Sequence, residues 1–187
     1  MKAKMAATLL LLLTIILNGC IPSVHPLYTE DDLVFKPEIL GTWIESGDEV
    51  EWVFEDSGKN SYIVRITEDG KLSNLDVHLV KLEDKFFFDF YPGENEHIKD
   101  MNGYLSLQFI SIHTFAKVII TDEYIEIHRF DPSWLEEILK EEPTLIKHEV
   151  TNDYILLTAS THELQRFILD YADVKEAYLE VEMLYRK

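Results

Sequence analysis

A single cysteine, Cys20, is the residue whose position most directly indicates chemistry in this chain. It follows a leader that begins with Lys2 and Lys4 and continues as an apolar run over residues 5–17, which is typical of a secretory signal. The run is shorter than the about 20 apolar residues that a membrane helix needs. Cleavage before Cys20 would leave an N-terminal thiol available for acylation. Because there is no second cysteine, an internal disulfide is excluded.

The residues Leu17-Asn18-Gly19-Cys20 resemble the lipobox of bacterial lipoproteins. The resemblance implies a lipoprotein signal peptide over residues 1–19, cleavage between Gly19 and Cys20, and a lipid such as palmitate attached to Cys20. The chain would then be exported and anchored in the cell envelope. Since Ile21 and Pro22 follow the cysteine in place of Asp, an outer membrane facing the periplasm is expected over an inner membrane. An uncleaved anchor and a secreted protein with a free thiol are the alternatives.

Other chemistry-bearing residues do not assemble into a known site. The seven histidines lack the short spacing of zinc ligands, and the chain contains neither a Gly-x-Ser-x-Gly elbow nor a glycine-rich phosphate loop. Acidic pairs such as Glu141-Glu142 are expected on a solvated surface of this composition. We therefore predict no catalytic residue, no metal, no cofactor and no enzymatic activity. The histidines are His25, His78, His97, His113, His128, His148 and His162.

Charge limits the partners of the chain. It carries 17 Lys and Arg against 35 Asp and Glu, a formal net charge of −18. Removal of residues 1–19, with their two lysines, lowers the charge to −20 (−18 − 2). Nucleic acid is excluded, because its binding requires basic patches. Anionic headgroups would repel the folded part at short range, so membrane attachment is expected through the lipid on Cys20.

Composition divides the exported part into two. Residues 20–39 contain three of the six prolines and are predicted to be the lipidated cysteine and a stiff tether, which reaches up to about 60 Å when fully extended. Apolar residues such as Leu27, Tyr28 and Phe35 indicate that part of the tether docks on the domain. Residues 40–187 are predicted to form a single domain.

The domain begins with a period of two, which predicts half-buried antiparallel strands. Residues 49–55 place Val50, Trp52 and Phe54 on one face, and residues 60–68 and 71–82 repeat the pattern around an Asp69-Gly70 hairpin turn. Further strands are predicted at 86–91, 105–121 and 124–130. The fold class is therefore mainly β with some α, an antiparallel meander that closes into a barrel or a sandwich.

Two late helices are predicted to cover an end or an edge of this sheet. Asp131 and Pro132 are good first residues for one helix, which Pro143 ends. Ser160 and Glu163 form a capping box for the other. Short strands at 145–150 and 154–158 lie between them, and residues 177–184 are predicted to be a last edge strand or a short helix.

Two family resemblances extend these predictions. Gly41-Thr42-Trp43 is similar to the Gly-x-Trp signature that opens the lipocalin barrel, in which the tryptophan plugs the closed end. By this resemblance Arg129 is a candidate for the cation that packs on the tryptophan. Residues 25–34 and 157–167 look like a group of poorly characterised bacterial lipoproteins. That resemblance implies an anchored envelope protein without an established activity.

Two non-catalytic functions follow. A lipocalin-like barrel can bind a small apolar ligand or lipid, and aromatic residues are numerous enough either to line such a cavity or to fill the interior solidly. The alternative is an envelope interaction or inhibitor protein whose acidic surface binds a basic protein partner. The aromatic residues in question are Trp52, Phe54, Phe86, Phe88 and Phe90.

Overall fold

The computed structural model describes residues 20–47, 50–93, 102, 104, 109–151 and 154–187. The predicted leader, including Gly19, lies outside the described residues. Glu49 and residues 105–108, which belong to predicted strands, lie outside them as well. No helix within the described part of the chain has the length and hydropathy needed to cross a membrane.

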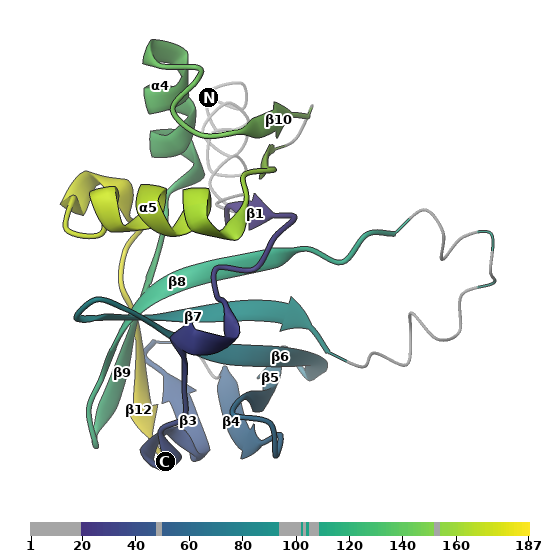
Figure 1. The fold of residues 1–187 in the computed structure, drawn as a ribbon. Coiled ribbons are helices and arrows are strands. Elements are labelled where there is room, and N and C mark those ends of the chain that lie inside the picture. The colour runs from purple at the N-terminus through teal and green to yellow at the C-terminus, as the bar shows by residue number, and fades with distance from the viewer. Residues whose placement is uncertain (1–19, 48–49, 94–101, 103, 105–108, 152–153) are drawn as a thin grey trace, which may run out of the picture.

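Eight of the described strands close into an antiparallel barrel (Figure 1). Consecutive strands pair with each other, β8 pairs with β9, and the last strand lies between β9 and β3. The mainly β meander is confirmed, and it closes as a barrel with no open edge among these strands. The strands are β3 (Gly41–Glu45), β4 (Glu51–Asp56), β5 (Tyr62–Glu68), β6 (Lys71–Leu82), β7 (Lys85–Pro92), β8 (His113–Ile120), β9 (Tyr124–Arg129) and β12 (Glu182–Arg186).

The predicted alternation and turn chemistry are confirmed in the first hairpins. Trp52, Phe54, Tyr62 and Val64 are all buried in the barrel. Both turn residues between β5 and β6 have positive φ, Asp69 at 50° and Gly70 at 73°. That is the backbone of the type I′ turn, whose twist matches the flanking strands.

Two of the predicted strands differ from those observed. β8 begins at His113, and residues 109–112 are not in a strand. The reason is a lack of partners, because β9 ends opposite Ala116 and β7 pairs with β8 only as far as Thr114. Near the end of the predicted range 177–184 the last strand is confirmed as β12, but its predicted place at an edge of the sheet is wrong. Lys175–Ala177 is one turn of 3₁₀ helix, and β12 is an interior strand paired on both sides.

The segment predicted as a tether lies against the barrel along its length. β1 (Pro22–Ser23) pairs with β8, and β2 (Leu33–Val34) pairs with β6. Ile21, Leu27 and Ile39 are buried. Ile21 and Leu27 pack among apolar side chains on the outside of the barrel wall, and Ile39 packs among those that fill the barrel. Cys20 therefore lies next to the folded body, and the extended reach of about 60 Å does not apply to these residues.

Both predicted helices form with their predicted caps. α4 (Pro132–Glu141) has Asp131 as its N-cap, accepting from the amide of Ser133, and α5 (Thr161–Tyr171) has the Ser160–Glu163 capping box. β10 (His148–Val150) and β11 (Ile155–Leu157) lie between them in sequence, and β11 pairs with β1. The two helices and this small extension lie together on the side of β8 (Figure 1).

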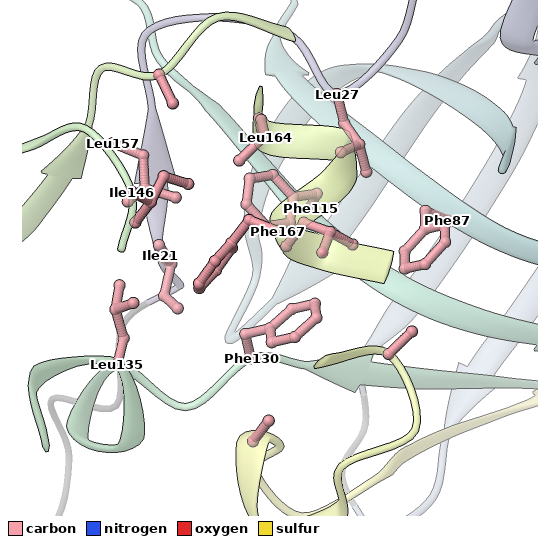
Figure 2. Close-up of a cluster of buried hydrophobic side chains, with 14 of the residues drawn as sticks. Ile21, Leu27, Phe87, Phe115, Phe130, Leu135, Ile146, Leu157, Leu164 and Phe167 are labelled. Atoms are coloured by element: carbon pink, nitrogen blue, oxygen red, sulfur yellow. The ribbon is translucent and has the colours of Figure 1, made fainter. Parts of the chain in front are cut away.

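The helices cover an outer face of the barrel wall beside β8. Phe87 and Phe115 point outward from the wall toward Leu164 and Phe167 of α5, and Ile21 and Leu157 complete the contact (Figure 2). We call this set of buried residues the helix cluster. Its buried members lie between Ile21 and Ala177, so all of them follow the predicted cleavage point.

The two segments that resemble the lipoprotein group contact each other. Thr161 Oγ1 donates to the carbonyl of Pro26 at 2.9 Å, and Gln165 Nε2 donates to the carbonyl of Leu27 at 2.9 Å. The same amide nitrogen donates to the Asp32 carboxylate at 2.8 Å. The N-terminal segment is thus fastened to α5 by side-chain hydrogen bonds.

A second set of buried side chains, the barrel cluster, fills the closed end of the barrel. Trp43 is fully buried there, and its Nε1 donates to the carbonyl of Ile39 at 2.8 Å. The Arg186 guanidinium lies 4.2 Å from the centre of the Trp43 ring. It reaches this position over Gly41, whose φ is 122° and where a Cβ would lie 3.3 Å from Arg186 Nη1.

The cation on the tryptophan is therefore Arg186, and the prediction of Arg129 is wrong. Arg129 ends β9 opposite Ala116, at the other end of the barrel from Gly41, which starts β3 opposite Phe54. Arg186 ends β12 opposite Trp43 and also donates to the carbonyls of Glu38, Leu40 and Asp122.

We expect Arg186→Ala to lower the free energy of unfolding by about 1–3 kcal/mol, because the cation–π contact and several hydrogen bonds to carbonyls are lost together. Arg65→Ala is the matched control. Its ion pair with Glu55 is exposed on both sides, so about 1 kcal/mol or less is expected. Urea unfolding followed by far-UV circular dichroism measures both. Equal losses would contradict a special role for Arg186.

Candidate functional site

A cavity of about 530 Å³ opens at the end of the barrel opposite Trp43. Each of the eight barrel strands contributes to its wall at the end where β3, β5, β7 and β9 finish and β4, β6, β8 and β12 begin. The mouth is therefore set by the closure of the sheet. The lining residues on these strands include Glu45, Trp52, Ile66, Glu68, Ser73, Leu75, Phe90, Thr114, Arg129 and Glu182.

The aromatic residues predicted to line or fill the interior do both, at different depths. Trp52 and Phe90, 3% and 4% exposed, line the cavity. Phe54 and Phe88 are buried in the barrel cluster without lining the cavity, with ring centres 5.7 Å apart. Phe86 packs against the same cluster, under the ammonium group of Lys36. The closed half of the barrel is filled with side chains, and the open half holds the cavity.

An ion pair stands at the mouth of this cavity. Arg129 Nε donates to Glu182 Oε1 at 2.5 Å, and Nη2 donates to Oε2 at 3.0 Å. The guanidinium also lies 5.7 Å from the centre of the Phe90 ring. Pairing of β9 with β12 places both residues, because Glu182 is opposite Ile127, two residues before Arg129. Burial alone would lower the pKa of Arg129, but its hydrogen bonds and charge contacts with Glu182 and Cys20 raise it overall.

Cys20 lies beside this ion pair. Arg129 Nη1 donates to Cys20 Sγ at 3.1 Å, and the free thiol is partly exposed. The predicted lipid-attachment residue is thus at the rim of the barrel mouth, although 109 residues separate it from Arg129. No local pattern in the sequence indicates this contact, because it depends on β1 lying along β8. Acylation of Cys20 stays a prediction.

A second group of polar side chains lies under the N-terminal segment, on the outer face of β6 and β7. Asp89 is fully buried and accepts from the Leu27 amide and from His113 Nδ1, both at 2.7 Å. Tyr28 stacks on His78 with ring centres 4.4 Å apart. The sequence does not single out Asp89, since an acidic residue between two phenylalanines is typical of a solvent-facing strand position. Here the N-terminal segment covers it.

Burial shifts the titration of this group. Desolvation lowers the pKa of His78, although Asp89 and Asp76 favour its charged form, and its Nδ1 has no hydrogen-bond partner among the described residues. Desolvation, with the charge of Asp89, raises the pKa of Tyr28 to about 12. Within the described residues, no three His, Cys, Asp or Glu side chains gather as a metal site.

Comparison with family models, with curated proteins and with solved structures finds no significant match. The geometry of the barrel mouth and of Cys20 is therefore what indicates a function.

We expect the protein to lose stability as the pH falls from about 7.5 to 5.5. The unfolded chain takes up a proton at His78 near the ordinary pKa of about 6.5, whereas the folded chain has a lowered pKa and resists protonation, so acid favours unfolding. His78→Phe keeps the stacking on Tyr28 and should reduce this pH dependence. Urea unfolding at a series of pH values measures it.

His162→Phe is the control for this experiment, because His162 is exposed on α5. The pKa values of Asp32 and Glu163 are also lowered, so these carboxyl groups change the stability only at pH values below this window. A pH slope that His78→Phe leaves unchanged would show that His78 does not carry the effect.

Proposed function

We propose that this chain is a non-catalytic lipoprotein of the bacterial cell envelope that binds a small apolar ligand or lipid in the open end of its lipocalin-like barrel. The observation that carries the proposal is the cavity of about 530 Å³ whose inner wall includes Trp52, Phe90, Ile66 and Leu75. Its volume lies within the roughly 300–1,000 Å³ that small-molecule sites occupy. Apolar walls favour an apolar ligand, because binding removes hydrocarbon surface from water on both sides.

The position of Cys20 supports the second part of the proposal, a lipid anchor beside the mouth. Ile21 is 4% exposed and Pro22 and Ser23 are buried in β1, so the chain has no free spacer immediately after the cysteine. Acyl chains on Cys20 would therefore hold the barrel mouth near the membrane surface. Attachment of this kind needs more than one acyl chain, since a single chain gives only marginal binding. Ile21 and Pro22 favour the outer membrane, facing the periplasm.

Replacement of the anchor residue tests the attachment. We expect wild-type protein made in a bacterial host to incorporate labelled palmitate and to start at Cys20 after removal of the leader. Cys20→Ser should abolish the label and leave the leader uncleaved, because the thioether cannot form. Mass spectrometry of the N-terminal peptide measures both outcomes. Unmodified sulfur on wild-type protein from membranes would contradict the anchor.

Filling the cavity tests the binding site. Leu75 lines the cavity from β6, so Leu75→Trp should occupy it and reduce binding of a hydrophobic dye at least about tenfold by steric exclusion. Leu72→Trp adds the same ring on the same strand, where the side chain is 56% exposed, and should leave dye binding unchanged. Fluorescence titration of the mature chain measures the affinities, and thermal unfolding confirms that both variants are folded.

Equal dye binding by the wild type and Leu75→Trp would show that the dye does not occupy the cavity. Absence of both dye uptake and copurified lipid in native mass spectrometry of the wild type would count against a binding function.

A further inference from the structure

We propose that one acyl chain carried by Cys20 is the resident ligand of the barrel cavity of the same molecule. This inference rests on the proposed function, because it names the occupant of that cavity and takes the lipid on Cys20 as its source. Three features carry it: the short distance between the thiol and the mouth, the paired backbone that follows Cys20, and the apolar inner wall.

The Cys20 sulfur is one side chain away from the cavity. Its Sγ accepts from Arg129 Nη1 at 3.1 Å, and Arg129 lines the cavity. The same guanidinium lies 5.7 Å from the centre of the ring of Phe90, which is also a lining residue. A thioether sulfur keeps lone pairs that accept weakly, so acylation leaves the contact with Arg129 in place. A group attached to Sγ therefore starts at the rim of the mouth.

The backbone that follows Cys20 holds the sulfur at this position. Pro22 is opposite Thr114 of β8, and Thr114 lines the cavity. On its other side β1 pairs with β11, where Ser23 is opposite Leu157. Because β1 is paired on both sides and begins two residues after the cysteine, the first atoms of an attached chain cannot move far from the mouth.

A ligand attached at the rim has an advantage over a free one. Attachment through a short linker gives an effective concentration of the order of millimolar. Trp52, Ile66 and Leu75 offer the chain an apolar wall, and each methylene that leaves water contributes about 0.8 kcal/mol. A free apolar ligand of equal intrinsic affinity would have to exceed the effective concentration to displace the attached chain.

The bilayer is the competing location for this acyl chain. It also removes methylenes from water, with about the same gain for each one. The acyl chains that the cavity does not hold would then form the membrane anchor. A free ligand that enters the cavity would move the attached chain into the bilayer, and by linkage insertion into the bilayer would favour entry of a free ligand. The ligand site and the anchor are thus coupled.

Attachment of a single alkyl chain tests this inference, because Cys20 is the only cysteine of the sequence. The mature chain, residues 20–187, contains the buried members of both clusters. Hexadecyl methanethiosulfonate converts its thiol into a mixed disulfide that carries a hexadecyl chain, with methanesulfinate as the leaving group. Methyl methanethiosulfonate attaches a methyl group by the same reaction, and dithiothreitol removes either one.

The hexadecyl-modified chain should bind a hydrophobic dye at least about tenfold more weakly than the methyl-modified chain, because the attached chain occupies the cavity. Treatment with dithiothreitol should restore the affinity. Fluorescence titration measures both, and size-exclusion chromatography checks that modification does not aggregate the protein.

A second attachment point provides the matched control. In the double variant Cys20→Ser/Glu123→Cys the thiol lies in the exposed turn between β8 and β9, at the closed end of the barrel. The hexadecyl and methyl forms of this variant should bind the dye equally. A loss of dye binding as large as that seen with Cys20 would show that the position of attachment is irrelevant, which contradicts the inference.

Vesicle binding reports the chain when it is outside the cavity. Leu75→Trp fills the cavity and should expel the hexadecyl chain. Sedimentation with phosphatidylcholine vesicles should show binding at least about fivefold stronger for hexadecyl-modified Leu75→Trp than for the hexadecyl-modified wild type. Leu72→Trp, with its exposed side chain, should match the wild type. Equal vesicle binding by the modified wild type and Leu75→Trp would place the chain outside the cavity and overturn the inference.

These outcomes separate the inference from the function on which it rests. If the methyl-modified wild type binds no dye, the cavity itself fails as a binding site. If it binds the dye and the hexadecyl form binds equally well, the cavity stands and the attached ligand is wrong. The palmitate label on Cys20 decides native acylation separately, and unmodified sulfur there would overturn the inference by removing its source.

Discussion

The pairing of β12 with both β3 and β9 is the constraint on which the rest of the structure depends. Without it β3 and β9 would each present an open edge, and the barrel would have no enclosed mouth. The same short strand supplies a key group at each end. Its first residue, Glu182, pairs with Arg129 at the mouth, and its last paired residue, Arg186, covers Trp43 at the closed end. The strand pairing that closes the barrel therefore also positions the groups at its two ends.

Local chemistry was predictable from the sequence, and long-range pairing was not. The Asp69-Gly70 turn and the two helix caps each depend on residues within a few positions, so their residue types identify them directly. The role of β12 depends on strands that are more than 50 and more than 130 residues away in sequence. A segment of this kind at the end of a chain looks the same whether it ends a sheet or closes a barrel, so the sequence predicts only an edge strand or a short helix there.

The path of the N-terminal segment is also not predictable from the sequence. Its prolines indicate a stiff linker, yet hydrogen bonds to distant residues hold it in place. The buried Asp89 carboxylate accepts the amide of Leu27, and that bond offsets part of the cost of burying a charge on the outer face of β7. Neither residue indicates the other in the sequence. Their contact fixes the path of residues 20–34, and with it the position of Cys20 at the mouth.

Packed side chains fill one half of the barrel interior and the cavity occupies the other half. This division limits the selectivity that the site can have. Phe54 and Phe88 fill the closed half, so the cavity ends at the level of Trp52 and Phe90. Under the proposed function, a ligand would place its apolar part below that level, and a polar group would stay among the polar side chains of the mouth. Apolar walls discriminate weakly between chains that differ by one methylene, by about 1–3 kcal/mol. Under the proposed function, the polar groups at the rim, such as Arg129 and Glu182, would therefore have to supply most of the selectivity.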